Sequence, residues 1–137
     1  MEKIRVDVQW CDGNFGATFG ANVPGAVVFT ASTIEGLQKE ARETLQFHME
    51  GMREDGDEVP QWFITGDYEF EWNYVDTATL LRAVEPYASI ASISRASGIN
   101  QHQLSHYANR VKTPRPQQRQ RIVDGLHKIG HELIAVV

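Results

Sequence analysis

The side chains with the most specific chemistry lie in one short polar segment, residues 101–109. Glutamine and asparagine amides offer a donor and an acceptor side by side, which matches the edge of adenine in the DNA major groove. Serine and histidine add single hydrogen bonds. At helical spacing, one face of the segment carries only such residues: Gln101, His102, Ser105, His106 and Asn109. The opposite face carries Leu104, Tyr107, Ala108 and Val111. The pattern predicts a helix that packs on its apolar side and presents hydrogen-bonding groups on the other.

Basic residues follow this segment directly, where a chain leaving the major groove would meet phosphate groups. With the residues at the start and edge of the helix, the candidate DNA-binding set is Asn100, Gln101, His102, Gln103, Ser105, His106, Asn109, Arg110, Lys112 and Arg115. The alternative is an ordinary solvated helix face, because polar residues on a surface need no functional explanation. The basic cluster favours DNA over that alternative.

Two short helices joined by a tight turn are expected to position these residues. Ser89 is expected to cap the first helix, in which Ile93 faces inward. Gly98 stands where a helix commonly ends in the left-handed conformation, Ile99 fills the turn, and Asn100 caps the second helix. This design is a helix-turn-helix, whose second helix lies in the DNA major groove.

Further helices are predicted on both sides of this motif. Asp76 should cap a helix that runs to Val84, and Pro114 and Pro116 mark the entry to a last helix. An apolar stripe along that last helix comprises Ile122, Leu126, Ile129, Leu133 and Val136. Such a stripe is more often core than a dimer seam. Gly125 and Gly130 weaken a helix interior, so we expect close helix contacts to favour them.

The first half of the chain has strand periodicity. Alternating apolar residues predict strands over residues 4–10, 15–19 and 68–74, with another strand at 26–30. Between them, Ser32-Thr-Ile-Glu35 reads as a capping box with Ser32 at the cap, followed by a helix that ends near Gly56. Strands and helix together predict a small α+β unit, a curved sheet with one helix on its apolar face.

Charge divides the sequence into two parts. Residues 1–75 hold 14 acidic and 5 basic side chains, whereas residues 76–137 hold 4 acidic and 8 basic ones. Only the second part is therefore a credible nucleic-acid surface, and the acidic part should prefer a basic partner. The candidate partner-binding residues are Glu50, Glu54, Asp55, Asp57 and Glu58. The alternative for this charge run is a solvated face. We therefore expect two domains, 1–75 and 76–137.

Other function classes find little support in the sequence. His127 and His131 share a helix face but lack a third metal ligand, and no serine or cysteine nucleophile stands beside a base in a known pattern. We expect no catalytic residue, no metal and no cofactor. No apolar run approaches the roughly 20 residues that span a bilayer, and no signal peptide is evident. Cys11 is the only cysteine. These features predict a cytoplasmic protein without membrane contact.

Several segments resemble the HicB-type antitoxins. The N-terminal domain of that family is similar to the run Val23-Pro-Gly-Ala, to Thr33-x-Glu35 and to Phe47-His-Met-Glu-Gly-Met-Arg-Glu-Asp-Gly-Asp-Glu-Val-Pro60. Residues 98–109, with Pro114-Arg115 after them, resemble the helix-turn-helix at the C-terminus of one HicB branch. The matching segments are spread over nearly the whole chain.

The resemblance implies an α+β chain: a partial ribonuclease-H-like β-β-β-α-β domain without nuclease activity, followed by an all-α helix-turn-helix domain. It implies that the first domain neutralises a HicA-type toxin, a small basic mRNA-cleaving protein with a double-stranded-RNA-binding fold. It also implies that the second domain binds operator DNA and represses the shared operon as a homodimer or larger assembly. Two alternatives stay open: a stand-alone repressor whose N-terminal domain senses a small ligand, and a hydrolase tethered to DNA.

Overall fold

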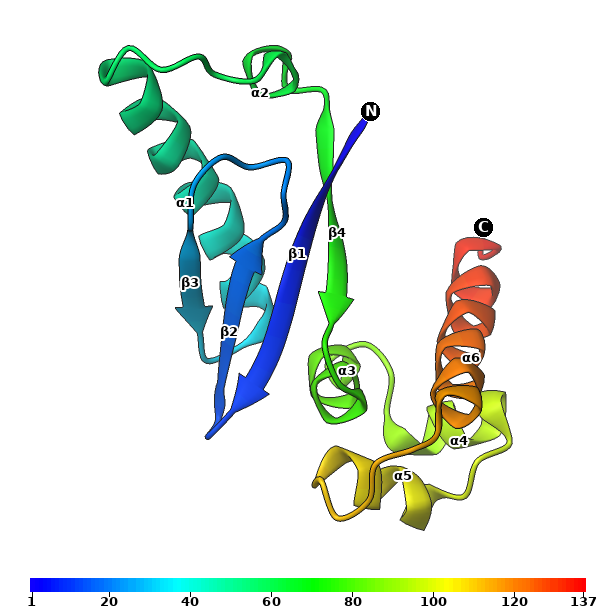
Figure 1. Cartoon of the computed structure of the whole chain (residues 1–137). Helices are drawn as coiled ribbons and strands as arrows, with labels where there is room; N and C mark the ends of the chain where they lie inside the picture. The colour runs from blue at the N-terminus through cyan, green and yellow to red at the C-terminus, as the bar shows by residue number, and fades with distance from the viewer. The chain divides into compact units, whose positions relative to one another are not determined.

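The computed structural model describes all 137 residues, which form a four-stranded mixed sheet and six helices (Figure 1). The chain divides into two compact units, Met1–Val75 and Asp76–Val137. All four strands and the first two helices belong to the first unit, and the second unit is entirely helical. The α+β class predicted from the sequence is confirmed.

The sheet in the first unit has the strand order β3-β2-β1-β4. Its strands are β1 (Glu2–Cys11), β2 (Asn14–Phe19), β3 (Val28–Ala31) and β4 (Tyr68–Tyr74). The first three strands are antiparallel neighbours, and β4 lies parallel to β1. The β1–β2 hairpin turns at Asp12 and Gly13, with φ angles of +52° and +76°. Two consecutive positive φ angles suit the right-handed twist of a hairpin, and an Asp-Gly pair is typical of such turns.

One face of the sheet is covered by α1 (Ile34–Glu54), which crosses it in Figure 1. Alternation along β1 turns Ile4, Val6 and Val8 toward the helix, and all three are fully buried. From α1, the residues that complete this core are Ile34, Leu37, Ala41, Leu45 and Met49. Burial of this paired apolar surface holds the first unit together.

Three local predictions in this unit were wrong. The cap of α1 is Thr33, whose hydroxyl accepts a hydrogen bond from the Gly36 N–H at 3.0 Å, not Ser32. The third strand begins at Val28, two residues later than predicted, because pairing with β2 decides its start. A short helix, α2 (Gln61–Thr65), was missed, so the element order is β-β-β-α-α-β. Five residues are too few for a periodic signal.

The second unit consists of α3 (Thr77–Val84), α4 (Ile90–Ser97), α5 (Gln101–Ala108) and α6 (Pro116–Ile134). Helix α5 packs against α3 and α4, and α4 packs against α6. The core of this unit comprises Leu80, Leu81, Ile93, Ile99, Leu104, Tyr107 and Ile122. The Asp76 carboxylate caps α3, as predicted, by accepting a hydrogen bond from the Thr79 N–H at 2.8 Å.

Two of the predicted apolar faces include residues that are exposed in the structure. Val111 is 63% exposed, because α5 ends at Ala108 and Arg110 adopts a φ of +57°, which turns the chain away from the packed face. On α6 only the first part of the apolar stripe is core. Ile122 is fully buried, whereas Leu133 is 62% exposed. None of the helices combines the length and the apolar content that a membrane crossing requires.

Candidate nucleic-acid interface

The turn between α4 and α5 is fixed by caps on both helices. The Ser89 hydroxyl accepts a hydrogen bond from the Ser92 N–H at 3.1 Å at the start of α4. Gly98 ends α4 with a φ of +74°, and the Asn100 side chain starts α5 by accepting from the His102 N–H at 2.8 Å. All three caps predicted from the sequence are confirmed. They hold α5 at a set angle to α4.

Packing inside the turn adds to this rigidity. Ile99 is buried, and its carbonyl accepts a hydrogen bond from the Ser94 hydroxyl at 2.5 Å. Beneath the turn, α6 approaches α4 so closely that a Cβ added at Gly125 would stand 3.1 Å from the Ser97 backbone nitrogen. Ile99 therefore packs the turn from inside, and α4, from which the turn starts, is packed against α6.

Helix α5 has one buried and one water-facing side. Leu104, Tyr107 and Ala108 are buried against α3 and α4. The water-facing side carries the predicted polar residues Gln101, His102, Ser105 and His106, of which the first two are exposed and the others half-buried. The imidazole rings of His102 and His106 lie side by side, with ring centroids 4.2 Å apart. Four of the candidate residues thus form one hydrogen-bonding strip along α5.

Other candidates have hydrogen-bonding roles inside the unit. Gln103 is half-buried and donates to the Tyr107 hydroxyl at 2.6 Å. The Asn109 amide accepts from the Arg82 guanidinium at 2.8 Å and donates to the Ser105 carbonyl at 2.9 Å. Asn109 therefore ties the end of α5 to α3. With Asn100 at the cap, these amides position the helix.

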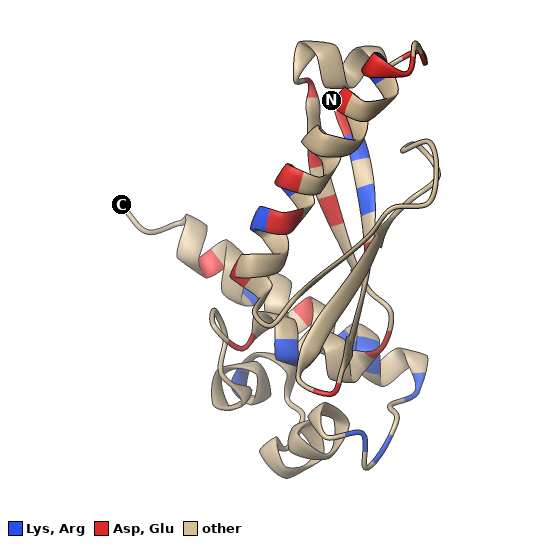
Figure 2. Ribbon diagram, turned by 90° about the vertical axis from the view of Figure 1, so that its left-hand side faces the viewer, with Lys and Arg blue, Asp and Glu red and all other residues tan.

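Arg110 begins the cationic loop between α5 and α6 and forms an ion pair with Asp76 at 3.1 Å. Partial burial acts to raise the pKa of the Asp76 carboxyl, but hydrogen bonds from Thr79 and Arg110 outweigh it and hold the pKa below its usual value. Lys112 and Arg115 are exposed on the same loop, among the basic residues coloured blue in Figure 2.

A polar hollow of about 470 Å³ lies between α5 and the start of α6. Gln103, Lys112 and Arg115 line it, together with Gln117 and Gln118, which are not among the candidate residues predicted from the sequence. A helix N-terminus with lysine and arginine beside it attracts anions, so this hollow suits a backbone phosphate. Pro116, typical of a helix start, was the sequence signal that placed these two glutamines near the loop.

The predicted partner-binding carboxylates gather at one end of the first unit. Glu50 and Glu54 lie on the last turns of α1, Asp55 ends the helix, and Asp57 and Glu58 follow in the loop. All five are exposed, and Figure 2 shows the acidic end of α1 in red. The structure therefore brings the set together as a solvated acidic surface.

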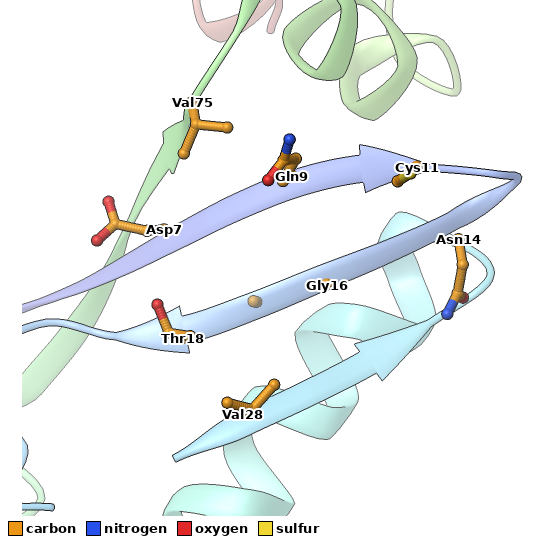
Figure 3. A pocket seen from close by; sticks show the side chains of 9 residues that line it. Asp7, Gln9, Cys11, Asn14, Gly16, Thr18, Val28 and Val75 are labelled. Atoms are coloured by element: carbon orange, nitrogen blue, oxygen red, sulfur yellow. The ribbon is translucent and has the colours of Figure 1, made fainter. Parts of the chain in front are cut away.

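A separate hollow of about 410 Å³ lies on the sheet face opposite α1 (Figure 3). Polar side chains from β1 and β2 line it, among them Asp7, Gln9, Asn14 and Thr18. The Asp7 carboxylate accepts hydrogen bonds from Arg5 at 2.8 Å and from Asn73 at 2.7 Å, which lower its pKa. The exposed Cys11 lies at the same rim.

Comparisons with protein-family models, with curated proteins and with solved structures gave no match to this chain. No three His, Cys, Asp or Glu side chains are placed so that they could hold a metal ion together.

Proposed function

We propose that this chain is a HicB-type antitoxin that also represses its own operon. In this proposal the second unit binds operator DNA with α5 as the recognition helix of a helix-turn-helix. The first unit binds and neutralises a small, basic, mRNA-cleaving HicA-type toxin. The proposal rests above all on the α4–turn–α5 geometry, because it combines a rigidly held helix, an outward hydrogen-bonding strip and a cationic loop at its end.

The order of residues along α5 supports DNA binding. In helix-turn-helix proteins the N-terminal part of the second helix contacts base edges, and Gln101 and His102 stand at that end. Beyond the other end, Lys112 and Arg115 lie where phosphate contacts fix the register of a protein on the duplex. The adjacent imidazole rings of His102 and His106 add flat polar groups to the same helix.

The first unit supports the antitoxin role through its charge and its topology. Its 14 acidic residues against 5 basic ones repel nucleic acid and attract a basic protein. The antiparallel strands β1 to β3, the helical crossover and the parallel strand β4 are compatible with a partial ribonuclease-H-like fold.

Selection of bound duplexes from a random DNA library tests the DNA-binding part with the full-length chain. We expect enrichment of one palindromic sequence with half-sites about one helical turn apart, because a single recognition helix reads only a few base pairs. A library that stays random after repeated selection contradicts this part of the proposal.

Co-expression tests the antitoxin part. We expect a short basic protein encoded beside this chain to stop growth when produced alone, and this chain to restore growth through its first unit. Arrest that this chain does not relieve contradicts the antitoxin role.

The sheet-face hollow favours a second candidate function, that of a ligand-sensing repressor. Its volume lies in the range of small-molecule sites, and it combines apolar lining residues with a few polar side chains, as such sites do. Thermal unfolding against a set of small polar metabolites distinguishes the two. A raised melting temperature with one metabolite, lost in Asn14→Leu, supports the sensor, whereas no shift with any of them supports the antitoxin.

A further inference from the structure

The outer face of α1 carries an aromatic side chain in water. Phe47 is 80% exposed in the second half of the helix, on the side away from the apolar stripe that is buried against the sheet. Burial of a phenylalanine ring contributes strongly to binding, and the exposed Phe47 ring is available for burial against a partner. A single exposed apolar residue is common, so the surroundings of Phe47 decide its meaning.

Carboxylates surround this ring on one side of the helix. At about 100° per residue, four glutamates fall within roughly 60° of Phe47 around the helix axis. They are Glu40, Glu43, Glu50 and Glu54. The cations Arg42 and Arg53 fall more than about 100° away by the same spacing. We call Phe47 with these four glutamates the Phe47 face.

The ring itself is accessible from the side. Gly51 lies one turn after Phe47, and a Cβ added there would meet no atom within 4 Å. Glu50 is held along the helix because its carboxylate accepts a hydrogen bond from Gln46 at 2.5 Å. The Lys39–Glu43 pair, at 3.8 Å with both side chains mostly exposed, neutralises little of the charge.

We propose that the Phe47 face is the docking surface for the basic toxin, with Phe47 inserted into an apolar pocket that the partner rims with lysine or arginine. This inference rests on the proposed antitoxin function and adds the surface that performs it. Charge complementarity selects the occupant, because the face repels nucleic acid and anionic membranes. A second copy of this chain would place two such acidic rings against each other.

Physical roles within the face differ. The glutamates accelerate encounter with a cationic surface, and this effect weakens as salt rises. Phe47 supplies the desolvated centre that a stable complex needs, so it acts mainly on the rate of dissociation.

The test measures binding kinetics between the full-length chain and a catalytically inactive form of the basic protein encoded beside it. Phe47→Ala should raise the Kd about 30-fold or more, chiefly through faster dissociation. Glu43→Gln with Glu50→Gln should slow association several-fold at low salt, and the difference should shrink at high salt. Neither change should alter thermal unfolding or DNA binding.

Two matched variants control for loss of surface apolar area and of charge. Val28→Ala removes an exposed apolar side chain from the sheet, and Glu35→Gln with Glu71→Gln removes two carboxylates outside the face. Both should bind like the parent. Parental affinity of Phe47→Ala, or equal losses in the controls, overturns the Phe47 face but leaves the antitoxin role. A parent chain that does not bind the basic protein overturns both.

Discussion

Asp76 has two roles at the start of the second unit, since it caps α3 and pairs with Arg110. The lowered pKa of its carboxyl means that the folded state favours the ionised form more than the unfolded state does. Asp76 thus links the first helix of this unit to the cationic loop after α5. The contact joins residues 34 apart in the chain, so no local sequence pattern contains it.

Two replacements of Asp76 should separate its effect as a helix cap from the effect of its negative charge. We expect Asp76→Ala to lower the free energy of unfolding of the second unit by about 1 kcal/mol, because it removes the cap. Asp76→Asn should cost less, since asparagine also caps helices. The check is urea unfolding of the full-length chain at pH 7.

The same two variants give the pH dependence. A folded-state pKa below the unfolded value of 3.8 stabilises the protein above that value, and the stabilisation is lost as pH falls through the folded pKa. The difference in unfolding free energy between the parent and Asp76→Asn should therefore disappear in the range below the usual aspartate pKa. A difference that persists or grows at pH 2 contradicts the role given to the charge.

Elements were predictable where their signals are local. Alternation located β1, β2 and β4, and the caps at Asp76, Ser89 and Asn100 follow from residue type and spacing. The missed helix α2 and the exposed second half of the α6 stripe depend on packing that periodicity does not contain. The same limit applies to the candidate site. Its hydrogen-bonding strip follows from helical spacing, but the structural role of Asn109 depends on Arg82, 27 residues away.

Replacement by alanine should have opposite effects on stability at two glycines of α6. A Cβ at Gly125 would stand 3.1 Å from both the Ser97 nitrogen and Cβ, so Gly125→Ala should destabilise the second unit by about 1–3 kcal/mol. A Cβ at Gly130 would meet nothing within 4 Å, so Gly130→Ala should stabilise it by about 0.5–1 kcal/mol. Close contact thus explains only the first of the two glycines. Urea unfolding of both variants is the measurement, and equal signs would refute the close approach of α4 and α6.

Across the whole chain, the boundary between acidic and basic parts coincides with the boundary between the two compact units. The acidic residues concentrate in Met1–Val75 and the basic ones in Asp76–Val137, and each unit has its own buried core. The proposed function needs this division, with an acidic unit for a basic protein and a more basic unit for DNA.

The proposed DNA binding requires at least two copies of the chain, because one recognition helix reads only a few base pairs. We expect sedimentation of the full-length protein with its selected duplex to give two or more chains for each palindrome. A single chain bound per duplex, with affinity unchanged when one half-site is deleted, is the outcome that excludes this assembly.

In the proposed function, α5 reads bases while the loop after it contacts phosphates. The most direct measurement is the affinity of Gln101→Ala and Lys112→Ala for the selected operator and for a scrambled duplex over a range of salt. Gln101 is exposed, so its loss should leave folding intact and weaken the operator complex alone, by about 1–3 kcal/mol. Lys112→Ala should weaken both complexes and reduce the salt slope by about one. Equal losses of affinity on both duplexes for Gln101→Ala, or no loss on either, would contradict base reading by α5.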